Sequence, residues 1–88
     1  MKTIQKFEIT IDSRQIAIPK DGQILCVQIH KGGIYIWASV DPKMPIELRN
    51  IEVLMTGQEM QSHWRREYIG TVQIYNGDIV LHVFEVWP

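Results

Sequence analysis

Apolar and polar residues alternate along most of this chain, which is the period of a β-strand with one buried face. Near the amino terminus, Phe7, Ile9 and Ile11 alternate with Glu8 and Thr10. Further short apolar stretches follow, separated by turns that contain Gly, Pro, Asn or Asp. The pattern predicts seven strands: Gln5–Ile11, Ile16–Ile18, Gln23–His30, Ile34–Val40, Ile46–Thr56 and the two arms of a hairpin within Tyr68–Glu85.

Three of these segments support more detailed predictions. Asn76-Gly77 lies between the two arms of the last hairpin and tolerates the positive φ angles of a type I′ turn. Gln23–His30 is almost continuously apolar, which predicts a central strand covered on both faces. The apolar alternation changes phase at Arg49-Asn50, which indicates a bulge or bend in that strand.

The remaining segments are irregular. Prolines at both ends of Pro42–Pro45 exclude a central strand and predict a loop. The segment Gln58–Glu67 lacks any alternating pattern, so a short helical turn near 58–66 and an ordered loop fit it equally well. We therefore expect one all-β domain over residues 1–88, folded as a small antiparallel sandwich or a partly open barrel.

Composition and charge narrow the functional classes. The chain has 88 residues, 45% of them apolar, and a net charge of −1, so it has no global field to attract duplex nucleic acid or an anionic membrane. Six basic residues face four acids up to Met44, giving +2, whereas three arginines face six acids from Pro45 onward, giving −3. A single cysteine, Cys26, and the lack of a signal peptide or an 18-residue apolar run predict a cytosolic protein.

Catalytic signatures are missing from the sequence. The histidines His30, His63 and His82 lie in separate elements without metal-ligand spacing, and His82 between two apolar strand residues is typical of a half-buried structural histidine. No serine stands in a nucleophile turn, and no glycine-rich phosphate loop occurs. We therefore expect no catalytic residue, metal or cofactor, and a protein that is not an enzyme.

Residues suited to recognition gather in one irregular segment. Trp64-Arg65-Arg66, next to His63, combines a stacking surface with two bidentate donors, which suits a nucleobase or a phosphate. Trp37 and Arg49 add to this candidate site if the fold brings them close. The alternative is that Trp64 packs on a neighbouring strand while the arginines cover a sheet edge in solvent.

Sheet edges and the carboxyl-terminal tail offer a second route to binding. A β-domain that does not close leaves unpaired backbone groups that a copy of itself or a target protein can extend. The apolar tail with Val86 and Trp87 either folds back on the core or is buried in a partner. We favour a homo-oligomer contact at Val86 and Trp87.

Four ordered blocks of sequence carry a family resemblance: Ile24-Leu-Cys-Val-Gln28, Ile36-Trp-Ala-Ser-Val-Asp41, Tyr68-Ile-Gly-Thr-Val-Gln73 and Leu81-His-Val-Phe-Glu85. Together they resemble a family of small proteins of unknown function from tailed phages and prophages. The resemblance implies a phage setting and a small, mostly β fold, and it transfers no catalytic residues.

These observations lead to two functional hypotheses. The first is a non-enzymatic phage accessory protein in the host bacterial cytoplasm, which counters antiviral defence by blocking an immune protein or sequestering a nucleotide messenger. The alternative is a structural or assembly protein of the phage particle, which would use its sheet edges.

Overall fold

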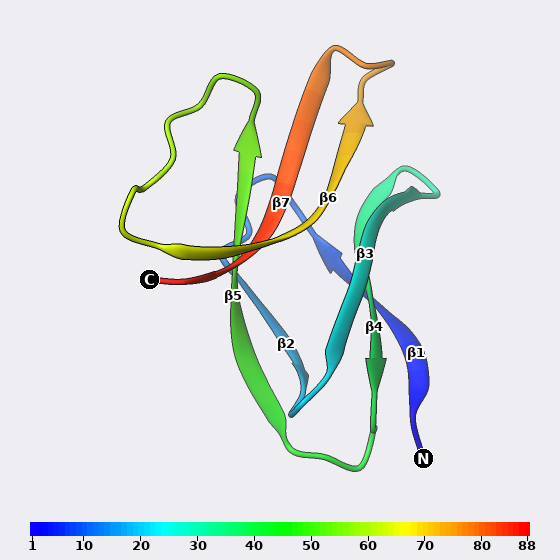
Figure 1. Cartoon of the computed structure of the whole chain (residues 1–88). Coiled ribbons are helices and arrows are strands. Elements are labelled where there is room, and N and C mark those ends of the chain that lie inside the picture. Colours follow the sequence, from blue (N-terminus) through cyan, green and yellow to red (C-terminus); the bar gives the residue numbers. More distant parts are fainter.

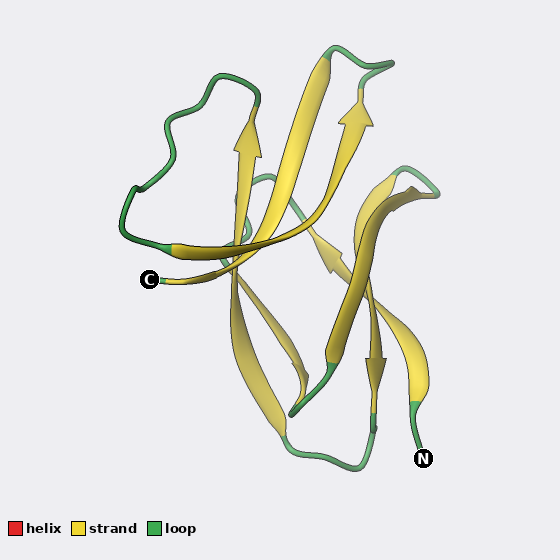
Figure 2. Cartoon of the chain, viewed as in Figure 1, coloured by secondary structure: helices red, strands yellow, loops and turns green.

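The computed structural model describes all residues 1–88 and shows seven strands and no helix (Figures 1 and 2). The seven-stranded all-β prediction is confirmed, and the segment 56–64 is a loop without a helical turn. The strands are β1 (Thr3–Ile9), β2 (Gln15–Pro19), β3 (Gln23–His30), β4 (Gly33–Val40), β5 (Ile46–Met55), β6 (Arg65–Ile74) and β7 (Ile79–Trp87).

Two antiparallel sheets form a small sandwich. One sheet has three strands in the order β1-β4-β3, and the other has four in the order β2-β5-β7-β6. Every pairing between neighbouring strands is antiparallel, and the sheets do not close into a barrel. The amino terminus leads into the three-stranded sheet and the carboxyl terminus ends the β7 strand of the other (Figure 1).

The core lies between the two sheets and is built from alternate strand residues. From β4, Ile36, Ala38 and Val40 are fully buried, and from the facing sheet Ile18 and Val83 are fully buried as well. Burying one large aliphatic side chain contributes roughly 1.5–3 kcal/mol relative to leaving it in water. This inward-facing set is why the alternating pattern of the sequence predicted the strands correctly.

β3 and β6 hold the two sheets in close contact, although they share no hydrogen-bonded pairing. A Cβ atom at Gly70 would lie 2.8 Å from Cγ1 of Val27, so only glycine allows this approach. Both strands are irregular near the contact, with register shifts between Ile24 and Cys26 and between Tyr68 and Gly70. A bulge bends its strand and increases the local twist, so both strands depart from regular geometry where the sheets meet.

The prediction that Gln23–His30 is a central strand was wrong. β4 is the central strand of its sheet, and β3 lies at the edge with Leu25 and Ile29 exposed on its surface. An apolar run reports that a strand contacts other groups, but it does not report how many strands flank it.

The predicted bulge or bend at Arg49-Asn50 is not a bulge, because neither pairing of β5 has a register shift there; instead, the strand changes partner from β2 at Asn50 to β7 at Ile51. The apolar pattern changes phase because Arg49 points inward and makes an ion pair there. Ile46 and Leu48 point outward instead and are each 64% exposed.

The hairpin of β6 and β7 is confirmed, but its turn begins one residue earlier than predicted. Tyr75, Asn76 and Gly77 all have positive φ angles, of 53°, 56° and 88°. Gly77 N donates to Ile74 O, and Asp78 N donates to Tyr75 O, so two overlapping turns form a four-residue loop between Ile74 and Ile79. Asn and Gly tolerate these angles, which is why the pair marked the turn.

Candidate functional site

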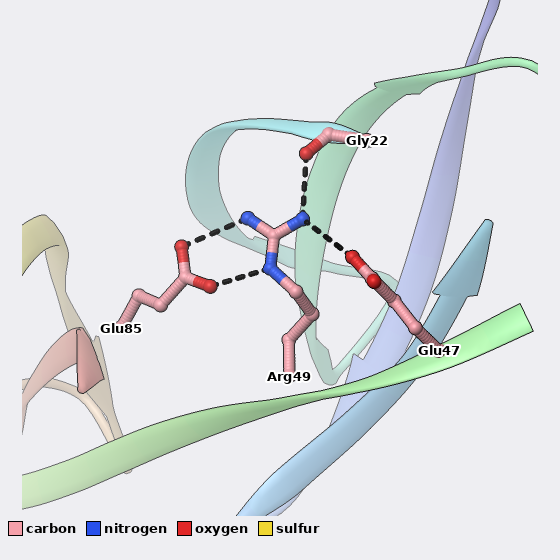
Figure 3. A network of polar contacts seen from close by, with 4 residues as sticks. All are labelled: Gly22, Glu47, Arg49 and Glu85. Atoms are coloured by element: carbon pink, nitrogen blue, oxygen red, sulfur yellow. Dashed lines mark hydrogen bonds and ion pairs between the residues drawn. The ribbon is translucent and has the colours of Figure 1, made fainter. Parts of the chain in front are cut away.

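An ion-pair cluster on the inner face of the four-stranded sheet contains Arg49, one of the predicted binding residues (Figure 3). Its Nε and Nη2 donate to the two carboxylate oxygens of Glu85, at 2.5 and 2.9 Å. Its Nη1 donates to the backbone oxygen of Gly22 at 2.7 Å and lies 3.7 Å from a carboxylate oxygen of Glu47. All three guanidinium nitrogens of Arg49 therefore already donate to acceptors within the chain.

Electrostatics hold this arginine in its charged form. The hydrogen bond with Glu85 raises the pKa of Arg49 above its ordinary value, burial acts in the opposite direction, and the charges of Glu85, Glu47 and Glu67 raise it further. Glu67 stands directly opposite Glu85 in the β6–β7 pairing. Two carboxylates thus contact the Arg49 guanidinium, and the charge of a third, Glu67, also favours its charged form.

Arg66 is also committed to a carboxylate, on the opposite face of the sheet. Its Nε donates to Glu52 at 2.7 Å, and its Nη1 donates to the backbone oxygen of Gln61 at 2.7 Å. The guanidinium carbon lies 5.9 Å from the centroid of the Trp64 ring. Arg66 thereby ties the 56–64 loop to β5, and most of its donors have partners.

Arg65 points to the other face of β6, because neighbouring strand residues alternate. It stands opposite Trp87 in the β6–β7 pairing, and its guanidinium lies 4.5 Å from the centroid of the indole ring. The predicted Trp64-Arg65-Arg66 cluster is therefore divided between two faces. Only Arg66 and Trp64 lie together, while Arg65 forms a separate, exposed pair with Trp87.

The other predicted residues lie elsewhere. Trp37 is on the outward face of β4, where its ring packs edge-on against His30 at 5.8 Å between centroids. Arg49 lies on the inner face of the four-stranded sheet, so the fold does not bring these two residues together. His63 is exposed in the 56–64 loop. His82 is half-buried, with its two ring nitrogens 2.7 and 3.1 Å from the hydroxyls of Thr56 and Thr71, as expected of a structural histidine.

The predicted carboxyl-terminal tail is the end of β7, where Val86 and Trp87 stand opposite Arg66 and Arg65 of β6. Val86 is 3% exposed and Trp87 is 38% exposed. Of the two residues predicted to form an oligomer contact, only Trp87 therefore presents a surface to a second molecule.

A groove that the sequence did not reveal runs along the second half of β5. We call it the β5 groove, and its volume is about 720 Å³. Its walls are the 11–15 turn and part of the 58–64 loop, and its floor includes residues 50–55. Two of the predicted residues line it, Trp64 from the binding set and Val86 from the oligomer contact.

A smaller groove of about 350 Å³ lies between β3 and β6 and contains Arg49, Glu67 and Glu85. Sequence reasoning missed Glu85, although a signal was present. Leu81, Val83 and Glu85 lie at alternate positions of one strand and therefore share a face, so the charged residue at the third position required a buried partner.

No group of three or more His, Cys, Asp or Glu side chains is arranged to hold a metal ion. No helix of the structure has the length and hydropathy needed to span a bilayer.

A family model described as "Domain of unknown function (DUF7352)" matches residues 1–88. No curated protein and no solved structure matches the chain significantly. The family description assigns no activity, so the function has to be argued from the side chains themselves.

Proposed function

The chain belongs to the DUF7352 family. We propose that it is a non-enzymatic binding protein whose partner is another protein. The observation that carries the proposal is that both partly buried arginines are already paired within the chain. Arg49 and Arg66, the two partly buried ones, are each bonded to a carboxylate within the chain. Neither guanidinium is free to grip an incoming phosphate.

This observation favours the blocking of a protein over the sequestering of a nucleotide messenger. A messenger with phosphate groups needs unpaired cationic donors that converge on one cavity. Arg65 is exposed, but it lies on the opposite face of β6 from Arg66 and stacks on Trp87. Protein surfaces, in contrast, are recognised through grooves and exposed apolar side chains. The β5 groove and the outward-facing Ile46 and Leu48 supply both.

The partner we propose is a component of bacterial antiviral defence, and the setting is the cytoplasm of a phage-infected host. Two observations support this: the ordered sequence blocks that resemble small phage and prophage proteins, and the lack of any catalytic signature. A protein of 88 residues can inhibit a larger enzyme by covering its working surface, because a standard interface needs only about 800 Å² per partner.

The test is to express the chain in bacterial strains that each carry one antiviral defence system and to challenge them with a sensitive phage. We expect plaque formation to be restored against at least one system, and the chain to copurify with a protein of that system. If plaque formation is restored against none of the systems, the proposed role in counter-defence is wrong.

Calorimetry separates the protein-blocking and messenger-sequestering versions. Cyclic dinucleotides and ADP-ribose-type messengers are titrated into the chain, and we expect no heat of binding. Heat that disappears in Arg65→Ala, but persists in the exposed control Lys43→Ala, would assign the protein to messenger sequestration.

A second candidate function is a structural or assembly protein of the phage particle. The observation in its favour is that neither sheet closes, so that β1 and β6 each end a sheet at an edge. Mass spectrometry of purified particles decides between the two functions. A stoichiometric copy number would support the structural role, whereas early expression and absence from particles would support the accessory role.

A further inference from the structure

The β5 strand has a hydrogen-bonded neighbour on only one side at each point along its length. Residues Ile46–Asn50 pair with β2 on one side, and residues Ile51–Met55 pair with β7 on the other. The last bond to the β2 side runs from Ile51 N to Arg14 O at 2.9 Å. Beyond this bond, the chain of the 11–15 turn leaves the strand, and the edge of β5 is open.

Strand geometry determines which backbone groups this open edge presents. In an antiparallel ladder, the N–H and C=O groups of alternate residues point to the same side. Ile51 N donates away from β7, so the N–H and C=O groups of Val53 point the same way, toward the β5 groove. The next N–H on that edge, at Met55, is occupied by Oε1 of Gln58 at 3.1 Å. Val53 therefore offers one donor and one acceptor, with Gln58 closing the far end.

The β5 groove borders this edge and is lined from both faces of the sheet. Val53 has the inward-facing phase of β5, whereas Leu54 and Val86 have the outward-facing phases of β5 and β7. Ile11 and Trp64 line the groove from the adjoining loops. An extended chain that lies against the edge directs its side chains alternately to these two faces. Both faces offer apolar contacts, so the occupant must have apolar residues at neighbouring positions.

We propose that a single extended peptide segment of a partner protein occupies the β5 groove and adds to the open edge of β5 as a further strand. The main-chain groups of Val53 supply the directional bonds, and the two apolar faces select the side chains. This inference rests on the proposed function in one respect, namely that the partner is a protein. It goes further by naming the site and the conformation of the bound segment.

The charge of the groove adds a preference. Glu52 lies in the groove but is neutralised by Arg66, which leaves Asp12 and Glu59 against Arg14. The groove is therefore weakly acidic, and a basic residue in the segment complements it. A free segment also fits better than a second copy of this fold, because the edge is flanked by the 11–15 turn and the 58–64 loop, which obstruct the edge of a folded sheet.

The test begins with a display library of peptides of about seven residues, long enough to span roughly 20 Å when extended. The full chain is the bait, and the matched variant pair is Ile11→Asp in the groove wall and Ile4→Asp outside it, on β1. Both residues are substantially exposed, so both variants are expected to fold. We expect selected peptides with adjacent apolar residues and a basic residue, bound about tenfold more weakly by Ile11→Asp and unchanged by Ile4→Asp.

Two readouts on the selected peptide distinguish strand addition from simple apolar docking. N-methylation of the peptide backbone should weaken binding at every second position only, since alternate N–H groups face the edge. Hydrogen exchange at the Val53 amide should slow by at least about tenfold in the complex, because the amide gains a partner. Binding without these two effects overturns strand addition.

The remaining outcomes are also decisive. A library that produces no peptide sensitive to Ile11→Asp overturns the proposal, and a dimer that Ile11→Asp dissociates would assign the edge to a second copy. If the peptide results hold but no defence system is inhibited, the proposed function fails and the strand-addition site stands. If a defence protein binds equally well to Ile11→Asp, the strand-addition site is wrong and the proposed function stands.

Discussion

Arg49 and Glu85 lie 36 residues apart in the sequence and meet as a bidentate ion pair between β5 and β7. Their side chains are 19% and 9% exposed, so the pair lies at the border of the core rather than in open solvent. The arginine that the sequence suggested for ligand binding thus has a partner inside its own chain. Its role in the fold is to neutralise the negative charge of Glu85 at the border of the core.

Replacing Glu85 by glutamine should destabilise the protein. The substitution leaves the partly buried Arg49 without its counter-charge, and we expect a loss of about 2–3 kcal/mol in the free energy of unfolding, somewhat less than for a fully buried pair. Urea denaturation measures the loss. Glu47→Gln is the control, because this weaker and more exposed contact should cost below about 0.5 kcal/mol. Equal effects of the two substitutions would contradict the assigned role of Glu85.

Above neutral pH, the ion pair should be insensitive to pH up to strong alkali. The raised pKa of Arg49 means that the contribution of the guanidinium to stability is fully present below the pKa of the unfolded arginine and is lost only as pH rises through the higher folded value. In Arg49→Lys, the loss should begin at about pH 10, near the ordinary pKa of lysine. Urea denaturation at about pH 7 and pH 11 should show a widening gap between wild type and variant. A constant gap would count against this account.

Gly70 should tolerate alanine only when Val27 is made smaller. A Cβ at Gly70 collides with Val27, and overpacking of this kind costs about 1–3 kcal/mol. Val27→Ala alone should cost roughly 1.6 kcal/mol, from two lost methyl groups. In the double variant, the total should fall below the sum of the single costs by about 1 kcal/mol. Thermal or urea unfolding of the four proteins tests this coupling, and strictly additive costs would disprove the contact.

Arg66→Gln should release the loop that follows β5. Arg66 holds the backbone oxygen of Gln61 and lies over Trp64, so its loss should increase proteolysis within residues 56–64 and change Trp64 fluorescence. Arg65→Gln is the matched control, because Arg65 contacts Trp87 on the other face and should leave the loop protected. If both variants are cleaved at the same rate, the loop is not held through Arg66.

Substitutions at Val86 and Trp87 should have different effects, the first on stability and the second on self-association. Val86 is buried, so Val86→Ala should lower the free energy of unfolding by roughly 1.6 kcal/mol. Trp87 keeps an exposed indole surface, and we propose that it forms the homo-oligomer contact. Light scattering after size exclusion should then show a smaller particle for Trp87→Ala. A mass that is unchanged by this substitution would exclude Trp87 as the contact.

The candidate site was much less predictable than the fold. The alternation in Tyr68–Glu85 predicted a hairpin because local backbone geometry and the need to bury one face act on neighbouring residues. The site depended on contacts between distant strands. The sequence grouped Arg65 with Arg66 because they are adjacent, whereas an extended strand directs adjacent side chains to opposite faces.

Alternation and turn chemistry are local properties, and they are enough to predict an all-β domain, the approximate positions of its turns and the inward face of most strands. The tertiary structure adds that Arg49 points inward and meets Glu85, that Gly70 passes against Val27, and that the second half of β5 keeps an open edge. These features follow from strand order. Strand order is set by the packing of segments far apart in the chain, and the local pattern contains no record of which strand will be the neighbour.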